Sequence, residues 1–361
     1  MQMTTGTPRT HENPPTPDAD RGTWLHRFAV ATAGMTLFLI VAGGMVTSTG
    51  SGLSVPDWPN TYNQNMFTFP LSRWVGGIFY EHGHRLVAST VGFLTIILAV
   101  WLQRADPRHW LRCLGWIALF TVIAQGVLGG MTVLFLLPTW ISVFHACLAQ
   151  TFFCIVISIA VCTSPAWKRR NATSMPSTGP ATRALCVGLV CVVFAQLLVG
   201  ALMRHAGAGL AVPDFPLIYG RLLPDLSDAS VADYNQERGF DYLLEPVTTQ
   251  QIAIHLLHRF GAVLVTIVLL ATTLTVLRRH GDVRLLRRPA ILAICLLVVQ
   301  IGLGAWTVWS GKAPGIATAH VAVGAATLAA SWVLTLRAYG HLRIARRLPA
   351  FRTVAMGGAA A

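Results

Sequence analysis

The sequence predicts an all-α polytopic membrane protein whose eight transmembrane helices form two parallel-repeat four-helix bundles. The first observation behind this prediction is composition. Of 361 residues, 54% are apolar and only 11% are charged, whereas soluble proteins carry about 25% charged residues. The second is that the apolar residues gather in eight long runs with the charges between them. The third is an internal repeat, in which motifs of the first half recur in the second half.

Each of the eight apolar runs has the length of about 20 residues that a helix needs to cross a bilayer core. They lie at residues 28–48, 83–103, 113–136, 141–163, 184–204, 252–277, 289–309 and 317–338. The mean hydropathy of the whole chain is +0.58, in keeping with this pattern. The chain is therefore expected to cross the membrane eight times.

The charges between the runs predict the orientation of the helices. The connecting segments "RADPRHWLR", "KRRNATSMPSTGPATR" and "RRHGDVRLLRR" and the tail "HLRIARRLPAFR" are basic, whereas residues 205–250 are mainly acidic. Because positive loops stay in the cytoplasm, we expect both termini to be cytoplasmic and the acidic loop to lie outside. The net charge of +13 then reflects topology and contact with anionic membrane lipid, and no nucleic-acid partner is expected.

These features divide the chain into five parts. The prediction is a disordered cytoplasmic tail at residues 1–26, a first four-helix bundle at 27–164, a cytoplasmic linker at 165–183, a second four-helix bundle at 184–340 with the outer loop 205–250, and a basic cytoplasmic tail at 341–361. The first of these parts is polar and rich in Pro and Thr, which is typical of a disordered segment.

The repeat is clearest after the first span of each half. "GSGLSVPDWP" at residues 50–59 and "GAGLAVPDFP" at residues 207–216 share seven of ten positions. Their prolines fix a turn, and Asp57 and Asp214 are interpreted as structural caps. Three further pairs lie 174 or 175 residues apart: "HRLVAST" and "HRFGAVL", "QGVLGGMTV" and "QIGLGAWTV", and "HACLA" and "HVAVG". Since both halves start inside, we expect parallel repeats about an axis along the membrane normal.

Four histidines are related by the repeat: His84, His145, His258 and His320. Each lies within about one or two helical turns of the outer surface. Ionisable residues in spans are candidates for functional sites, although a histidine bonded to a helix carbonyl is the plain alternative. Zinc takes three or four protein ligands, whereas two imidazoles from facing helices suit the axial positions of a heme, which supplies the other four nitrogens.

Arginines stand beside these histidines. Arg85 and Arg259 directly follow His84 and His258, and Arg204 closes the fifth span. Heme propionates are anionic, so each arginine is a possible propionate contact. The alternative is a side chain that extends to the membrane interface.

The two halves differ three residues before the first histidine of each pair. The first half has Glu81 there and the second half has His255, and residues spaced i,i+3 share a helix face. A carboxylate can accept a proton or stabilise positive charge near a reacting carbon. We therefore expect the first half to do chemistry and the second half to hold an electron-carrying heme. The alternative for Glu81 is an interfacial carboxylate paired with Arg85, and His82 is interpreted as an interfacial residue.

A family resemblance rests on these residues together. With "EHGHR" in the second span, "HLLHR" in the sixth, single histidines in the fourth and eighth, and the two proline motifs, the chain resembles the heme A synthase family over about residues 25–340. Members of that family oxidise the C8 methyl group of heme O to a formyl group, making heme A for cytochrome oxidase. One feature departs from some bacterial members, because residues 50–80 lack the cysteine pair of their first outer loop.

The resemblance implies a role for each site residue. Glu81 is then the catalytic carboxylate, His84 and His145 are the axial ligands of the substrate heme O, and His258 and His320 are the iron ligands of a heme b cofactor. It also implies a bacterial cell (inner) membrane location with heme sites toward the outer face. The expected partners are heme O synthase as substrate donor, an electron acceptor, and cytochrome oxidase assembly downstream.

Two other functions fit parts of the pattern. A non-enzymatic diheme cytochrome b electron carrier explains the paired histidines, but it needs no Glu81 and would place hemes at two depths. A heme or small-molecule transporter suits parallel repeats but favours helices interrupted near the midplane, whereas these spans run uninterrupted.

Overall fold

The structure, a computed structural model, describes residues 17–169 and 178–340, and within these residues it consists of helices and the segments that connect them. The helices are α1 (Pro17–Ser48), α2 (Gly77–Ala105), α3 (His109–Leu134), α4 (Thr139–Thr163), α5 (Pro165–Arg169), α6 (Pro180–His205), α7 (Asp228–Asp241), α8 (Thr249–His280), α9 (Arg284–Trp309) and α10 (Pro314–Gly340). Short 3-10 turns occur at Met66–Thr68, Leu71–Arg73 and Ala208–Leu210.

Eight helices in the described part of the chain are long and apolar enough to cross a membrane, which confirms the predicted number of spans. They are α1, α2, α3, α4, α6, α8, α9 and α10. Several extend a few residues beyond the apolar runs. At α8, for example, Thr248 and Gln251 form a reciprocal capping box, which satisfies backbone N–H groups at the helix start.

The structure differs from the predicted boundaries at two places. Helix α1 begins at Pro17, inside the predicted tail, while α5 and the start of α6 occupy part of the predicted linker. A proline favours a helix start because its missing N–H would have no helical partner there, and Pro165 and Pro180 also begin helices. Residues 1–16, 170–177 and the predicted basic tail 341–361 lie outside the described residues.

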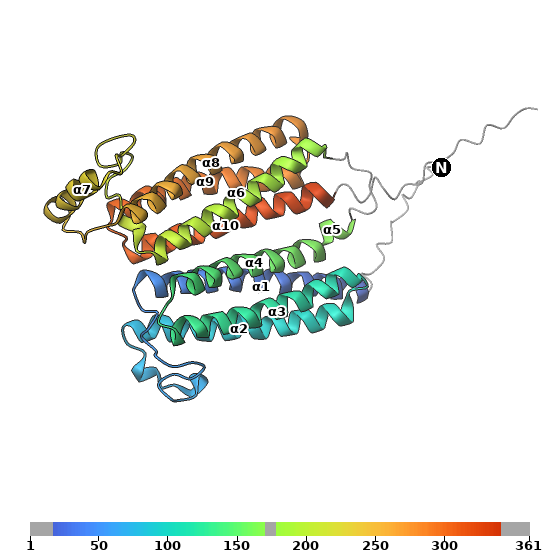
Figure 1. The fold of residues 1–361 in the computed structure, drawn as a ribbon. Helices are drawn as coiled ribbons and strands as arrows, with labels where there is room; N and C mark the ends of the chain where they lie inside the picture. The colour runs from blue at the N-terminus through green and yellow to red at the C-terminus, as the bar shows by residue number, and fades with distance from the viewer. Residues whose placement is uncertain (1–16, 170–177, 341–361) are drawn as a thin grey trace, which may run out of the picture.

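The spanning helices form two groups of four (Figure 1). In the first group α1, α2, α3 and α4 contact one another in a ring, and in the second group α6, α8, α9 and α10 do the same. Each group has its own apolar core, with Leu98 and Phe152 buried in the first and Leu189 and Leu328 in the second. That the groups are copies related by an axis along the membrane normal stays a prediction.

The two groups meet where α1 and α4 contact α6 and α10. The apolar side chains of Phe153 and Ala325 are buried at this seam. Beside them, Trp332 Nε1 donates hydrogen bonds to Ser158 Oγ at 2.8 Å and to the Cys154 carbonyl at 3.0 Å. The seam is therefore both apolar and specifically hydrogen-bonded.

The two long connecting segments lie at the same end of the helices, and α5 lies at the other end (Figure 1). In the first segment, the Asp57 carboxylate accepts hydrogen bonds at 2.8 Å from the N–H groups of Tyr62 and the next residue. In the second, Asp214 accepts at 2.9 Å from Tyr219 and the residue after it. Both aspartates thus stabilise a turn, which fits their interpretation as structural caps.

The second connecting segment contains the helix α7, which is anchored by buried side chains. Tyr234 of α7 stacks on Tyr219 with ring centroids 4.0 Å apart. Arg238 is buried and donates hydrogen bonds to the carbonyls of Leu210 at 2.6 Å and Glu245 at 2.9 Å. The acidic segment is therefore a folded cap at this end of the second group.

Candidate heme-binding sites

The four repeat-related histidines lie on four different helices at the end that carries the long segments. His84 is on α2, His145 on α4, His258 on α8 and His320 on α10, each about two to two and a half turns after the helix start. One pair thus belongs to each helix group. Within the described residues, no cluster of three or more His, Cys, Asp or Glu side chains is placed to hold a metal ion.

The second pair has the spacing that a shared iron requires. The ring centroids of His258 and His320 are 6.3 Å apart, with an angle of 68° between the ring planes. An iron bonded to one nitrogen of each ring at about 2 Å places the two ring centres about 6 Å apart. The two imidazoles therefore fit the axial positions of a heme, which brings its own four equatorial nitrogens.

The first pair comes from α2 and α4 of the first helix group, where a charge on the His145 ring would act on the His84 ring. Nδ1 of both rings is buried and makes no hydrogen bond to the described residues. The backbone of Gln125 lies near the His145 ring, but the geometry falls short of a hydrogen bond. Buried polar atoms without partners are rare in folded proteins and call for an explanation such as a missing ligand.

Glutamine amides lie beside three of the four histidines. Gln196 Nε2 is 3.1 Å from His258 Nδ1 and also donates to the His258 carbonyl at 2.8 Å. Gln300 Nε2 is 3.3 Å from His320 Nε2, so an iron at that nitrogen requires the amide to turn aside. Its repeat mate Gln125 instead donates to the His145 carbonyl at 2.8 Å.

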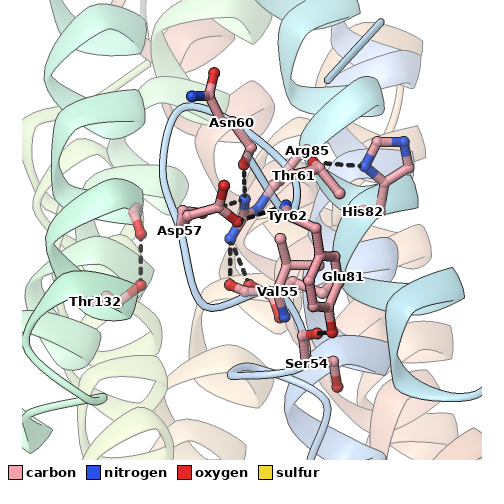
Figure 2. A network of polar contacts seen from close by, with 11 residues as sticks. Ser54, Val55, Asp57, Asn60, Thr61, Tyr62, Glu81, His82, Arg85 and Thr132 are labelled. Atoms are coloured by element: carbon pink, nitrogen blue, oxygen red, sulfur yellow. Dashed lines mark hydrogen bonds and ion pairs between the residues drawn. The ribbon is translucent and has the colours of Figure 1, made fainter. Parts of the chain in front are cut away.

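Glu81 is buried and both its carboxylate oxygens have partners (Figure 2). Oε2 accepts a hydrogen bond from the Val55 N–H at 2.7 Å, and Oε1 pairs with Arg85 Nη2 at 2.7 Å. The structure thus realises the pairing with Arg85 that the sequence left open. It places the pair inside the fold rather than at an exposed interface, as the side chains are only 4% and 9% exposed.

Arg85 clamps the first connecting segment onto α2 (Figure 2). Its Nη1 donates to the carbonyls of Asp57 at 2.7 Å and Asn60 at 2.9 Å, and its Nη2 donates to Val55 at 2.9 Å as well as to Glu81. All four Nη hydrogens are therefore used within the chain. The predicted forked contact with a propionate cannot form unless some of these bonds break.

Arg259 has the matching role in the second group, where it donates to the carbonyls of Leu217 at 2.8 Å and Asp214 at 2.5 Å. Arg204 is different, because its Nη2 bonds to the Gly44 carbonyl at 2.8 Å and to Ser48 Oγ of α1. It therefore crosses from the second helix group to the first, and it retains Nη1 and Nε as further donors.

Two further histidines are buried under the connecting segments. The interpretation of His82 as an interfacial residue is wrong, since it is fully buried, bonds to Thr61 Oγ1 at 3.0 Å and lies edge-on to Trp74. Its burial follows from the aromatic side chains of the segment, which cover it. His255, the counterpart of Glu81, places Nδ1 3.0 Å from the Ala208 carbonyl. Each half thus uses this position to hold its connecting segment.

Sequence reasoning did not single out the glutamines beside the histidines. Gln125 and Gln300 do recur at the repeat spacing, so the motifs that contain them carried a usable signal. Gln196 had no such signal, because its counterpart at the same spacing is Leu39.

The sequence that contains these sites is similar to known proteins. Residues 26–332 match the COX15-CtaA family, described as cytochrome oxidase assembly protein. A heme A synthase of Shouchella clausii is 28% identical over 284 residues, which cover 78% of this chain and 85% of that protein. A heme A synthase of Symbiobacterium thermophilum is 28% identical over 287 residues, covering 78% and 84%. One of Sphingopyxis alaskensis is 26% identical over 339 residues, covering 84% and 89%.

Proposed function

Because the chain belongs to the COX15-CtaA family of cytochrome oxidase assembly proteins, we propose that it is a heme A synthase. In this function it oxidises the C8 methyl group of heme O to a formyl group and so supplies heme A for cytochrome oxidase. The observation that carries the proposal is the His258–His320 pair, whose 6.3 Å ring separation suits one heme iron. Relatives that bear this name and match most of the chain support it.

In the proposal, His258 and His320 hold a resident heme b in the second helix group. When bound, heme b supplies one-electron redox chemistry. The protein contributes the orientation of the two rings. Gln196 Nε2 donates a hydrogen bond to the His258 carbonyl at 2.8 Å, which ties the backbone of this ligand to α6.

His84 and His145 take the substrate, heme O, in the first helix group. Oxidation of its methyl through a hydroxymethyl to a formyl group removes four electrons, so the reaction needs an electron acceptor or an oxygen-linked partner. Glu81 is the proposed catalytic residue, since it lies one turn before His84 and has no carboxylate counterpart in the second half. Its contacts with Arg85 and Val55 hold the carboxylate in one place, as catalysis by a preorganised charge requires.

Among the three arginines, Arg204 is the best propionate contact. Arg204 uses only Nη2 in its hydrogen bonds and retains Nη1 and Nε as donors. The Nη groups of Arg85 and Arg259 instead donate to backbone carbonyls. Arg85 and Arg259 remain candidates only through donors that these contacts leave unused.

The proposal places the chain in a bacterial inner membrane with both termini in the cytoplasm. The basic turns lie at the end opposite the long segments, and positive loops face the cytoplasm. The heme sites then face the outer side. Heme O synthase is the expected substrate donor, and membrane lipid surrounds both helix groups.

The test is to purify the protein with its pigments and to compare wild type with Glu81→Gln. We expect wild type to carry heme b together with heme O or heme A. Glu81→Gln should carry heme b and heme O but no heme A, with an unchanged low-spin heme b spectrum. That spectrum is the internal control for folding.

Two outcomes contradict the proposal. Two equivalents of heme b per polypeptide with no other heme would identify a diheme electron carrier. Conversion of heme O by Glu81→Gln at the wild-type rate would remove Glu81 from catalysis.

A further inference from the structure

Each of the four paired histidines packs its ring against a glycine of the preceding membrane-spanning helix. The ring atom Cε1 of His84 lies 3.0 Å from the place where a Cβ on Gly43 would stand. The same distance is 3.1 Å for three further contacts. These are His145 with Gly129, His258 with Gly200, and His320 with Gly304. The contacts join α1 to α2, α3 to α4, α6 to α8 and α9 to α10.

The contacts follow the repeat although they join different helices. Gly43 and Gly200 are 157 residues apart, and Gly129 and Gly304 are 175 residues apart, which are the spacings of the repeated motifs. The same ring atom faces the glycine in all four cases. Two of these contacts join helices connected by the long segments, and two join helices connected by short turns. Because the contact is the same in both settings, we attribute it to the positions that the imidazoles must take rather than to incidental packing.

The physical requirement is close approach. Non-bonded carbon atoms prefer separations of about 3.5–4.0 Å, so a methyl group at any of these glycines would push the ring away by about half an ångström. Metal–ligand distances tolerate only about 0.2 Å of change. A shift of this size therefore disturbs the fit of two facing rings to one iron.

We propose that Gly43, Gly129, Gly200 and Gly304 are positioning residues, whose missing Cβ sets the depth and tilt of the four imidazoles. This inference rests on the proposed function, since it assigns a heme to each pair. Gly200 and Gly304 set the rings that hold heme b, and Gly43 and Gly129 set the rings that take heme O.

The same four helices supply matched controls. A Cβ added at four other glycines of these helices would have no atom within 4 Å. These glycines are Gly34 on α1, Gly126 on α3, Gly188 on α6 and Gly302 on α9. Alanine at a control position has the same effect on helix propensity as alanine at a positioning glycine, but it touches no ring. The comparison thus isolates contact with the imidazole.

The experiment purifies the eight single alanine variants and records heme content and low-spin absorption and EPR signals of the iron. Gly200→Ala and Gly304→Ala should retain heme b about tenfold less tightly, the lower range for loss of an orienting partner, or show a shifted low-spin signal. Gly43→Ala and Gly129→Ala should keep the heme b signal and lose heme O. The four control variants should match wild type.

The outcomes separate this inference from the proposed function. Wild-type protein without low-spin heme would overturn the proposed function itself. Wild-type protein with low-spin heme, and positioning variants whose heme content and EPR signal equal those of their controls, would overturn the inference alone. Because two variants probe each site, a variant that does not fold is replaced by its partner across the same heme. If both variants of one site lose their heme while their controls keep it, the heme of the other helix group reports on folding. A general folding defect would remove that heme too, so its retention shows that the loss is confined to the altered site.

Discussion

The buried Glu81–Arg85 pair makes a quantitative prediction about the first connecting segment. Arg85→Met removes three hydrogen bonds to backbone carbonyls and leaves the Glu81 carboxylate, which is 4% exposed, without its cation. Removing one partner of a buried ion pair costs about 3–5 kcal/mol. We therefore expect Arg85→Met to lower the free energy of unfolding by about 4 kcal/mol.

The repeat supplies the matched control. Arg259 makes equivalent backbone contacts, but His255 replaces the carboxylate. Arg259→Met therefore breaks the hydrogen bonds to Leu217 and Asp214 without stranding a charge. It should lower the free energy of unfolding by about 2 kcal/mol, since each hydrogen bond contributes about 1 kcal/mol. The difference between the two variants measures what the stranded carboxylate contributes.

A double-mutant cycle isolates the free-energy cost of the unpaired Glu81 carboxylate. Glu81→Gln added to Arg85→Met removes the unpaired charge, so the two substitutions should be non-additive by about 2 kcal/mol, within the range for residues in direct contact. The assay is equilibrium unfolding by SDS titration from mild detergent, with limited proteolysis of residues 51–76 as a local readout. Equal losses for Arg85→Met and Arg259→Met, together with a coupling below about 0.5 kcal/mol, would refute the reasoning.

Three further predictions concern other polar contacts. Arg204→Met removes the donor to Ser48 and should destabilise contact between the helix groups by about 1–3 kcal/mol, seen as easier unfolding of α1 by hydrogen exchange, with Arg259→Met as the control. Burial raises the pKa of Asp106, but its hydrogen bonds with Arg108 outweigh burial and lower the pKa overall. A lowered pKa stabilises the fold above the pKa of the unfolded state, about 4. The stability difference between wild type and Asp106→Asn should therefore be constant from pH 7 to 5 and vanish as the pH falls through the native pKa. Arg238→Met should expose α7 to proteolysis without changing the heme spectra, because its contacts lie within the second connecting segment.

Much of the fold could be predicted because hydrophobic length and charge bias act locally. Eight apolar runs predicted eight spans, and the repeated motifs singled out four histidines, two of which, His258 and His320, the structure places ring to ring. What could not be predicted depends on contacts between distant segments. The burial of His82 results from Phe69 and Trp74 folding over it, and no pattern around "EHGHR" indicates that cover.

The predicted propionate contacts of the arginines also depended on contacts between distant segments that the sequence does not reveal. Next to a histidine, Arg85 suggested an anion-binding residue, because sequence alone does not count backbone carbonyls as competitors. The structure directs its guanidinium to Val55, Asp57 and Asn60. The prolines of the motif explain why these carbonyls are available, since a turn built on Pro leaves carbonyls without partners in a regular ladder.

Matching turns and arginine contacts in the two halves leave few places near the imidazoles where the chemistry of the halves can differ. Asp57 and Asp214 close the same turn in each half, and an arginine beside the first histidine clamps each connecting segment. The differences nearest the imidazoles are few: Glu81 against His255, and Leu39 against Gln196. Gln196 Nε2 donates a hydrogen bond to the His258 carbonyl, whereas Leu39 has no polar group to offer the backbone of His84. Under the proposed function, this extra hydrogen bond favours a second half that keeps its heme and a first half that exchanges one. A synthase needs this combination, because its cofactor must stay while its product leaves.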